Sequence, residues 1–453
     1  MLERRLKTIL FSIPGAARLQ NTYFPDGSLA LRLTRGVSWT ITGSVISSAS
    51  TLLASILVAR LLGAEDYGAL GIIQSSLGTF MVFAGTSLGL TATKYIAELR
   101  EKDPKRAGRI LVLTTQTSYL LSGIMSLLLL VGAPVIARSA LAAPQLAPHL
   151  RVAALTLFLS GINGAQIGAL AGFEAFGSIA RINLLRGLAT FPVLWIGTRF
   201  FGLLGSVIAL GVIAAISCAM SDIVLKRRIR QANFSPSREG AWSEAKLLLN
   251  FSLPANLTAV FFVVAIWISN LILVRQPNGY SQMGIFNAVN QWRVAILFLP
   301  TVMAQPFLAV LASLAGAGSG RQYRKAIRIS LAATTLAAFM PAILVSLFSG
   351  SIMSAYGAGF QRGALALVLV SVATALAAPS IAITNVLNSA GRAWSVFGMV
   401  MAWSLVFITA FYFLRGYGVH GLGCALLIAY LIQFLIVLLI AARFMKPTAA
   451  GAV

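Results

Sequence analysis

The sequence predicts an all-α polytopic membrane protein in which 12 transmembrane helices form two pseudo-symmetric six-helix lobes. Three observations predict this fold. The 453-residue chain is 58% hydrophobic and 10% charged, with a mean hydropathy of +0.87, a composition that a soluble globular protein does not keep in solution. Apolar runs long enough to cross a bilayer recur along the chain, and short motifs repeat at a nearly constant spacing.

The chain begins with a basic segment, residues 1–37, which precedes the first long apolar run. Pro14 and Gly15 interrupt this segment, so it lacks the continuous apolar core of a signal peptide, and we expect it to be retained on the cytoplasmic side. Its apolar residues keep a helical spacing. This spacing predicts either a short amphipathic helix on the inner leaflet or a partly disordered tail.

Twelve apolar runs follow, each long enough to be a membrane span. With an even number of spans, both termini lie on the same side of the membrane. Cytoplasmic termini place 27 Lys and Arg residues in inner segments and seven in outer segments, as the positive-inside rule favours. The predicted spans are 38–59, 69–91, 110–132, 150–172, 181–201, 203–225, 250–273, 283–306, 327–348, 363–386, 395–414 and 420–442.

An internal repeat predicts the two lobes. RFFGLLG at 199–205 recurs as RGYGVHG at 415–421, and KRAGRI at 105–110 recurs as RKAIRI at 324–329, so both pairs are separated by nearly the same stretch of chain. Copies of six spans keep the same orientation, so an axis along the membrane normal relates them and a cargo site is expected between them near the midplane. The predicted parts are an N-terminal lobe 38–225, a cytoplasmic linker 226–249, a C-terminal lobe 250–445 and a cytoplasmic tail 446–453.

The span 283–306 carries an arginine, Arg293, about halfway along. An unpaired guanidinium at that depth costs at least about 2.5 kcal/mol, so Arg293 is expected to face a partner or a wet cavity rather than lipid. Asn287, Asn290 and Gln291 share one arc of the helical wheel, with Arg293 at its edge. This polar side either bonds to neighbouring helices only or lines a path for an anionic cargo.

Basic residues near the ends of spans are further candidate contacts for an anionic cargo. Arg186, Arg181 and Lys94 are predicted near the inner mouth, where they either meet an entering headgroup or snorkel at the interface. Arg60 and Arg275 occupy similar places in the two halves on the outer side. Either release of the cargo or a structural cap is expected there.

All 11 acidic residues lie at or before Glu244, and the rest of the chain contains none. Glu174 and Asp222 are the carboxylates nearest a span, each at its inner end. Either one couples transport to protons, or both are paired with nearby arginines. A carboxylate-poor protein of this kind is a poor candidate for a cation exporter, which needs buried acidic groups.

Several other classes of function are disfavoured. Cys218, Cys424, His149 and His420 stand apart from one another, so neither a metal site nor a cofactor is expected. The basic clusters lie between apolar runs, where anionic lipid headgroups and topology explain them better than nucleic acid does. The outer loops are short and hold no pair of carboxylates or histidines for acid–base catalysis, which argues against an enzyme.

Five motifs together resemble the polysaccharide transporter family, the flippases of lipid-linked oligosaccharides that belong with the multidrug, oligosaccharidyl-lipid and polysaccharide exporters. The likeness covers residues 35–445. The signature at 60–68, inside the first motif, is the most specific. The motifs are ARLLGAEDYGALGII at 59–73, LPANLTAVF at 253–261, GIFNAVNQW at 284–292, IMSAYGAGF at 352–360 and NSAGRAW at 388–394.

The resemblance implies the fold of multidrug and toxic compound extruders (MATE). It also implies movement of an undecaprenyl-diphosphate-linked oligosaccharide from the cytoplasmic to the periplasmic leaflet of a bacterial inner membrane, for exopolysaccharide, O-antigen or capsule synthesis. A polysaccharide polymerase and chain-length proteins are the partners that it implies, besides membrane lipids. Two alternatives stay open. One is a peptidoglycan-precursor flippase, although the resemblance to that family implies 14 spans rather than 12. The other is a cation-coupled drug or metabolite antiporter.

Overall fold

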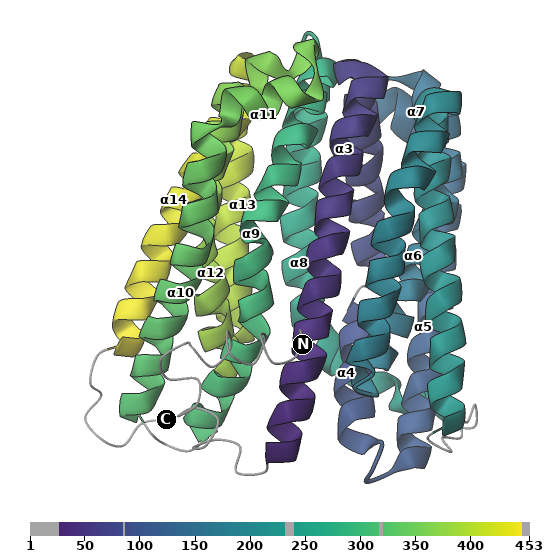
Figure 1. Ribbon diagram of the computed structural model, residues 1–453, viewed down its shortest axis with the longest axis vertical. Helices are drawn as coiled ribbons and strands as arrows, with labels where there is room; N and C mark the ends of the chain where they lie inside the picture. The colour runs from purple at the N-terminus through teal and green to yellow at the C-terminus, as the bar shows by residue number, and fades with distance from the viewer. Residues whose placement is uncertain (1–26, 85–86, 232–239, 317–319, 446–453) are drawn as a thin grey trace, which may run out of the picture.

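The computed structural model describes residues 27–84, 87–231, 240–316 and 320–445. These residues form helices and connecting turns, without a strand among them, and the helices run nearly parallel in one tall bundle (Figure 1). The tail 446–453 and most of the predicted N-terminal segment lie outside the described residues.

The N-terminal lobe contains five long elements, two of which hold two spans each. The elements are α3 (Gly27–Phe83), α4 (Ser87–Leu99), α5 (Pro104–Val135), α6 (Ala147–Gly172) and α7 (Phe176–Gln231), with short η1 (Ile136–Ala140) and η2 (Pro144–Leu146) between α5 and α6. The two that hold two spans each are the first, α3, and the fifth, α7. Gly63 in α3 and Gly202 in α7 have positive φ, of 76° and 55°, and each joins two helices at a sharp turn.

The C-terminal lobe follows a linker that ends in η3 (Ala241–Glu244). Its short α11 lies across one end of the bundle (Figure 1), where the sequence predicted a loop. The elements are α8 (Ala245–Val274), α9 (Gly279–Gly316), α10 (Gly320–Leu347), α11 (Ser349–Tyr356), η4 (Ala358–Gly363), α12 (Ala364–Ser389), α13 (Ala393–Leu414), η5 (Arg415–Tyr417) and α14 (Gly418–Met445).

The helices agree with the predicted spans in order but are longer. Eight segments of the described chain are long and apolar enough to cross a membrane, and three of them, such as Val45–Phe83, contain two helices joined at a turn. Together with α9 this is consistent with 12 spans. The second predicted span, 69–91, is divided between α3 and α4, and the first helix begins at Gly27 rather than at residue 38.

Left-handed turns recur at matched positions in the two lobes. Four residues with positive φ in the N-terminal lobe each have a counterpart in the C-terminal lobe, at nearly the spacing of the sequence repeat. Since few L-residues adopt this conformation, matched positions point to one ancestral backbone used twice. The pairs are Gly63 with Asn278, Ala142 with Gly357, Glu174 with Gly391, and Gly202 with Gly418.

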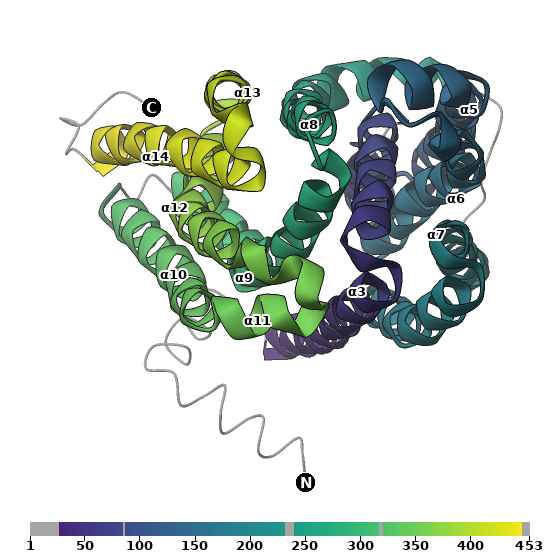
Figure 2. The same ribbon diagram turned by 90° about the horizontal axis from the view of Figure 1, so that it is seen from above.

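The two lobes meet along α3, which packs against α7 of its own lobe and against α8 and α9 of the other (Figure 2). The backbones of α3 and α9 touch at what we call the glycine seam, formed by Ala64, Gly68, Tyr280 and Gly284. A Cβ atom at Gly68 would collide with the Tyr280 carbonyl oxygen, and one at Gly284 with the Ala64 carbonyl oxygen. We call this end of the bundle the α11 end and the opposite one, where Glu244 lies, the linker end.

Candidate functional site

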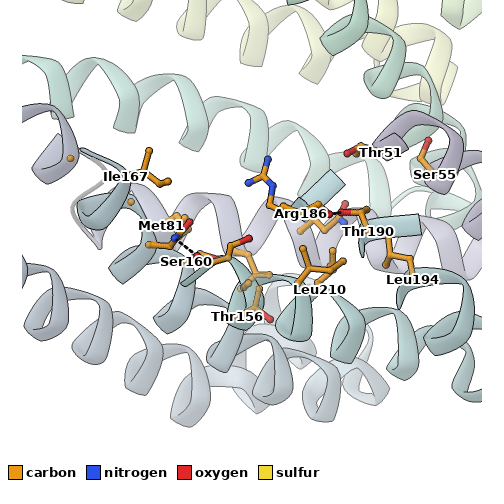
Figure 3. Close-up of a pocket in the computed structure, with 18 of the residues that line it drawn as sticks. Thr51, Ser55, Met81, Thr156, Ser160, Ile167, Arg186, Thr190, Leu194 and Leu210 are labelled. Atoms are coloured by element: carbon orange, nitrogen blue, oxygen red, sulfur yellow. Dashed lines mark hydrogen bonds between the residues drawn. The ribbon is translucent and has the colours of Figure 1, made fainter. Parts of the chain in front are cut away.

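A cavity of about 760 Å³ lies within the N-terminal lobe, between α3, α4, α6 and α7, and α9 contributes one residue to its wall. Hydroxyl and amide side chains from these helices line it together with apolar ones. Figure 3 shows hydroxyl residues such as Thr51 and Thr190 beside apolar ones such as Leu194. The polar lining residues are Thr51, Ser55, Tyr67, Gln74, Thr93, Thr156, Ser160, Asn163, Arg186, Thr190, Ser217 and Gln291.

Arg186 is the charged residue of this first cavity. It lies on α7, and its side chain extends among the lining residues (Figure 3). The guanidinium is solvent-accessible and makes no hydrogen bond or ion pair with a described residue, while its backbone carbonyl accepts a bond from Thr190 at 2.8 Å. A guanidinium in this state has all five donors available to an anion.

A second cavity, of about 240 Å³, lies between the lobes and contains Arg293. Its walls come from α3 of one lobe and from α8, α9, α13 and α14 of the other. The half-buried Arg293 donates from Nε to Asn290 Oδ1 at 2.8 Å and from Nη1 to the Tyr430 hydroxyl at 3.4 Å. Arg293 was expected to face a partner or a wet cavity rather than lipid. It has two hydrogen-bond partners and also lines a cavity.

Gln74 on α3 and Gln291 on α9 line both cavities. They therefore stand at the boundary between the two spaces, one from each lobe. Asn287 and Asn290 line the second cavity, and Asn287 lies against Gly71, where a Cβ would come within 2.9 Å of its side chain. The polar arc predicted on this helix thus faces the other lobe.

Other predicted residues lie outside both cavities. Arg181 is exposed on α7, and Lys94 is exposed on α4 with its ammonium 4.8 Å from the Tyr95 ring centroid. Arg60 and Arg275 are exposed at the α11 end, where Arg60 donates to one backbone carbonyl of the other lobe and Arg275 to two.

The two carboxylates considered for coupling are both in ion pairs near the linker end. Asp222 lies 2.6 Å from Lys226, one turn further along α7. Glu174 lies 2.7 Å from Arg100. Neither carboxylate lines a cavity, and the cavity linings contain no described Asp, Glu or Lys.

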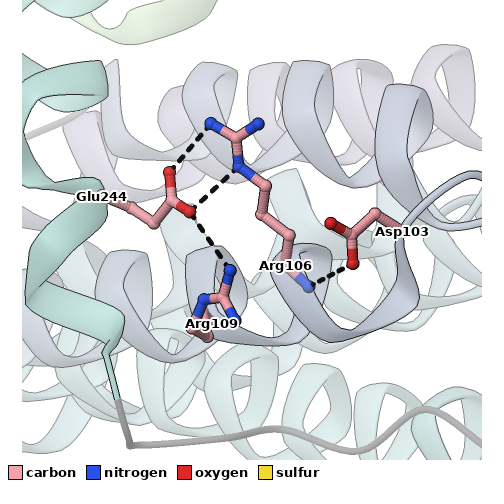
Figure 4. A network of polar contacts seen from close by, with 4 residues as sticks. All are labelled: Asp103, Arg106, Arg109 and Glu244. Carbon is pink, nitrogen blue, oxygen red and sulfur yellow. Dashed lines mark hydrogen bonds and ion pairs between the residues drawn. The ribbon is translucent and has the colours of Figure 1, made fainter.

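Two features were missed by the sequence reasoning. The first is Tyr430 of α14, whose hydroxyl accepts a hydrogen bond from Arg293. A single tyrosine in an apolar span does not indicate from the sequence that it contacts an arginine of another helix. Glu244 of the linker is bound by Arg106 at 2.9 Å and by Arg109 at 3.6 Å (Figure 4). The clustering of basic residues in the predicted inner loop 92–109 was the available signal for it. No group of His, Cys, Asp or Glu among the described residues is arranged to hold a metal ion.

Solved structures confirm the fold. An inward-facing multidrug resistance MATE family transporter aligns with a TM-score of 0.77 and 18% identity, over 89% of this chain and 96% of its own. A eukaryotic MATE transporter, AtDTX14, aligns with a TM-score of 0.69 and 15% identity, over 92% and 98%. A transporter of the same superfamily from Pyrococcus furiosus, described as having a binding pocket of reverse polarity, aligns with a TM-score of 0.67 and 15% identity, over 92% and 96%.

Curated relatives carry names of export proteins. The EPS I polysaccharide export inner membrane protein EpsE of Ralstonia nicotianae is 27% identical over 399 residues, 85% of this chain and 88% of its own. EpsE of Ralstonia solanacearum is 24% identical over 408 residues, with the same coverage. The sequence profile of the polysaccharide biosynthesis protein family matches residues 33–312. That match covers more than half of the sequence, and the chain therefore belongs to the polysaccharide biosynthesis protein family.

Proposed function

We propose that this inner-membrane protein is a flippase for an oligosaccharide linked to a lipid diphosphate, of the undecaprenyl type. The observation that carries this proposal is the charge of the two cavities. Each contains one arginine, Arg186 or Arg293, and neither contains a described carboxylate. In this proposal the linker end faces the cytoplasm, as the distribution of Lys and Arg favours, and the cargo moves towards the α11 end.

The chemistry of the lining fits such a cargo. A diphosphate carries two or more negative charges, and a guanidinium binds phosphate oxygens through two parallel hydrogen bonds. Arg186 is available for this contact, while Arg293 is held in place by Asn290 and Tyr430. The hydroxyl and amide groups that surround Arg186 suit the hydroxyl groups of a sugar chain.

A cation-coupled antiporter is disfavoured by the same observation. Export of a cationic drug needs an acidic group in the cavity, and the carboxylates nearest the spans, Glu174 and Asp222, are neutralised by basic neighbours at the linker end. The relatives named as polysaccharide export proteins support a saccharide as the cargo and transport rather than catalysis as the activity.

The test measures the transfer of a labelled lipid-linked oligosaccharide from one leaflet to the other in vesicles that contain the full chain. Charge-assisted hydrogen bonds are worth about 1.5–3 kcal/mol, so Arg186→Ala and Arg293→Ala should each slow transfer by about 10- to 100-fold. Lysine at either position keeps the charge but loses the two-pronged contact, and part of the rate should remain. Arg199→Ala, at an exposed arginine on α7 outside both cavities, is the matched control.

Unchanged transfer by both alanine variants, at equal protein level, would remove this site from the proposal. Supplying the same vesicles with a peptidoglycan lipid precursor and with a cationic dye separates the alternatives. Faster movement of the precursor would reassign the cargo, and pH-driven movement of the dye would replace the flippase by an antiporter.

A further inference from the structure

Arg60 reaches from one lobe to the other at the α11 end. It lies on α3 shortly before the turn at Gly63, and its Nε donates to the carbonyl oxygen of Ala355 at 2.5 Å. Ala355 belongs to α11, in the C-terminal lobe. This hydrogen bond therefore joins two residues that are far apart in the sequence and connects the two lobes.

Arg275 makes the same connection in the opposite direction. It follows the last residue of α8, and its Nε donates to the carbonyl oxygen of Ala140 at 3.0 Å, with Nη2 directed at that of Ser139. Both acceptors belong to η1 in the N-terminal lobe. The two donors, Arg60 and Arg275, are as far apart in the sequence as the two acceptors, Ala140 and Ala355, so donor and acceptor both repeat at the spacing of the duplication.

The surroundings of the two arginines are contacts between the lobes. The Tyr280 hydroxyl donates to the Leu141 carbonyl oxygen at 2.8 Å, and the Tyr67 ring meets that of Phe360 edge-on at 5.9 Å. The glycine seam lies beside them. Neither Arg60 nor Arg275 is ion-paired with a described carboxylate, so the neutral carbonyl groups of the opposite lobe are their partners.

We infer that Arg60 and Arg275 are two reciprocal latches that hold the α11 end closed, rather than contacts for the cargo. Both bonds must break before the lobes separate at this end, and both re-form when the lobes meet again. Because the acceptors are backbone groups, no side chain of the opposite lobe has to be retained for the latches to work. The inference rests on the proposed function in one respect, that a transporter alternates between two conformations.

The experiment measures opening without any cargo. A reporter cysteine replaces Leu194, which lines the first cavity and is 8% exposed, in a Cys218→Ser, Cys424→Ser background. A membrane-impermeant maleimide is added to vesicles on the side that the α11 end faces. Exposed charged contacts are worth about 0.2–1 kcal/mol, so Arg60→Met or Arg275→Met should raise the labelling rate by about two- to fivefold. The double variant should show about the product of the two increases, since the bonds share no partner.

Methionine keeps the length of the side chain and removes the donors. Arg415→Met is the matched control, because its guanidinium lies 4.4 Å from the Tyr412 ring centroid within its own lobe. Labelling after denaturation reports total protein, and a monodisperse elution profile reports folding. Unchanged labelling in the double variant, or an equal increase in Arg415→Met, would overturn the inference. Weaker binding of inorganic pyrophosphate with unchanged labelling would show that both arginines contact the cargo and would overturn the inference. Unchanged transfer in Arg186→Ala would contradict the proposed function and not the latches, because labelling is measured without cargo.

Discussion

The two ends of the bundle hold the lobes together in different ways. At the α11 end, Arg60 and Arg275 make the same contact twice, in opposite directions, beside a seam of two glycines that is also reciprocal. At the linker end, Glu244 is bound by Arg106 and Arg109, and this contact is made once because the linker occurs once. The contacts of the α11 end therefore follow the internal repeat of the chain, whereas the contact of the linker end does not.

The largest expected effect comes from the glycine seam. In Gly284→Ala the added methyl group would collide with the Ala64 carbonyl oxygen, so the backbones of α3 and α9 must separate. Overpacking of this kind costs about 1–3 kcal/mol, and labelling of the cysteine at position 194 from the α11 side should rise by about tenfold.

Gly398→Ala is the control for this substitution, because a Cβ at Gly398 has no atom within 4 Å. It should leave labelling unchanged. If Gly284→Ala labels at the parental rate while the protein stays folded, the seam does not set the closure of the α11 end.

An intermediate effect is expected at the linker end. The Glu244 side chain is 10% exposed and that of Arg106 is 41% exposed, so Glu244→Gln leaves two arginines without their acceptor charge. With one partner half in solvent, the loss should be about 1–2 kcal/mol, and the Tm measured in detergent should fall by a few degrees. The cysteine at position 194 should label as before. A change in labelling would show that the two ends are coupled.

The smallest effect is expected for Asp222→Asn. Its ion pair with Lys226 lies on the surface of α7, outside both cavities, where such pairs contribute little. Transfer of lipid-linked oligosaccharide should change by less than about twofold, a limit set by the weakness of exposed pairs. A large loss of transfer, with a shifted dependence on external pH, would make this carboxylate part of the energy coupling.

Much of the fold could be predicted from the sequence because a bilayer requires each span to be apolar over a fixed length. A span needs about 20 apolar residues, so hydropathy placed the helices and the basic clusters between them. The rule does not fix where a helix stops. α9 continues to Gly316, well beyond its predicted end at residue 306, and α11 is too short to give a periodic signal.

The candidate site could be predicted from the sequence only in part. A charge in an apolar span has to be accommodated, so Arg293 was predicted to face a partner or a wet cavity rather than lipid. It lines the second cavity together with the amide side chains near it. The contacts of Arg60 and Arg275 were not predictable, since their acceptors are backbone carbonyls and every residue has one. Which basic residue lines a cavity also depends on packing. Arg186 does and Arg181 does not, although both lie on the same helix.

The reciprocal bonds also have the form of a contact between two identical subunits. In a homodimer with a two-fold axis, residue i of one copy contacts residue j of the other, and j contacts i. Arg60 with Ala355 and Arg275 with Ala140 keep this isologous form inside a single polypeptide. Each half holds both a donor and an acceptor, so this contact meets the requirement for pairing two identical subunits.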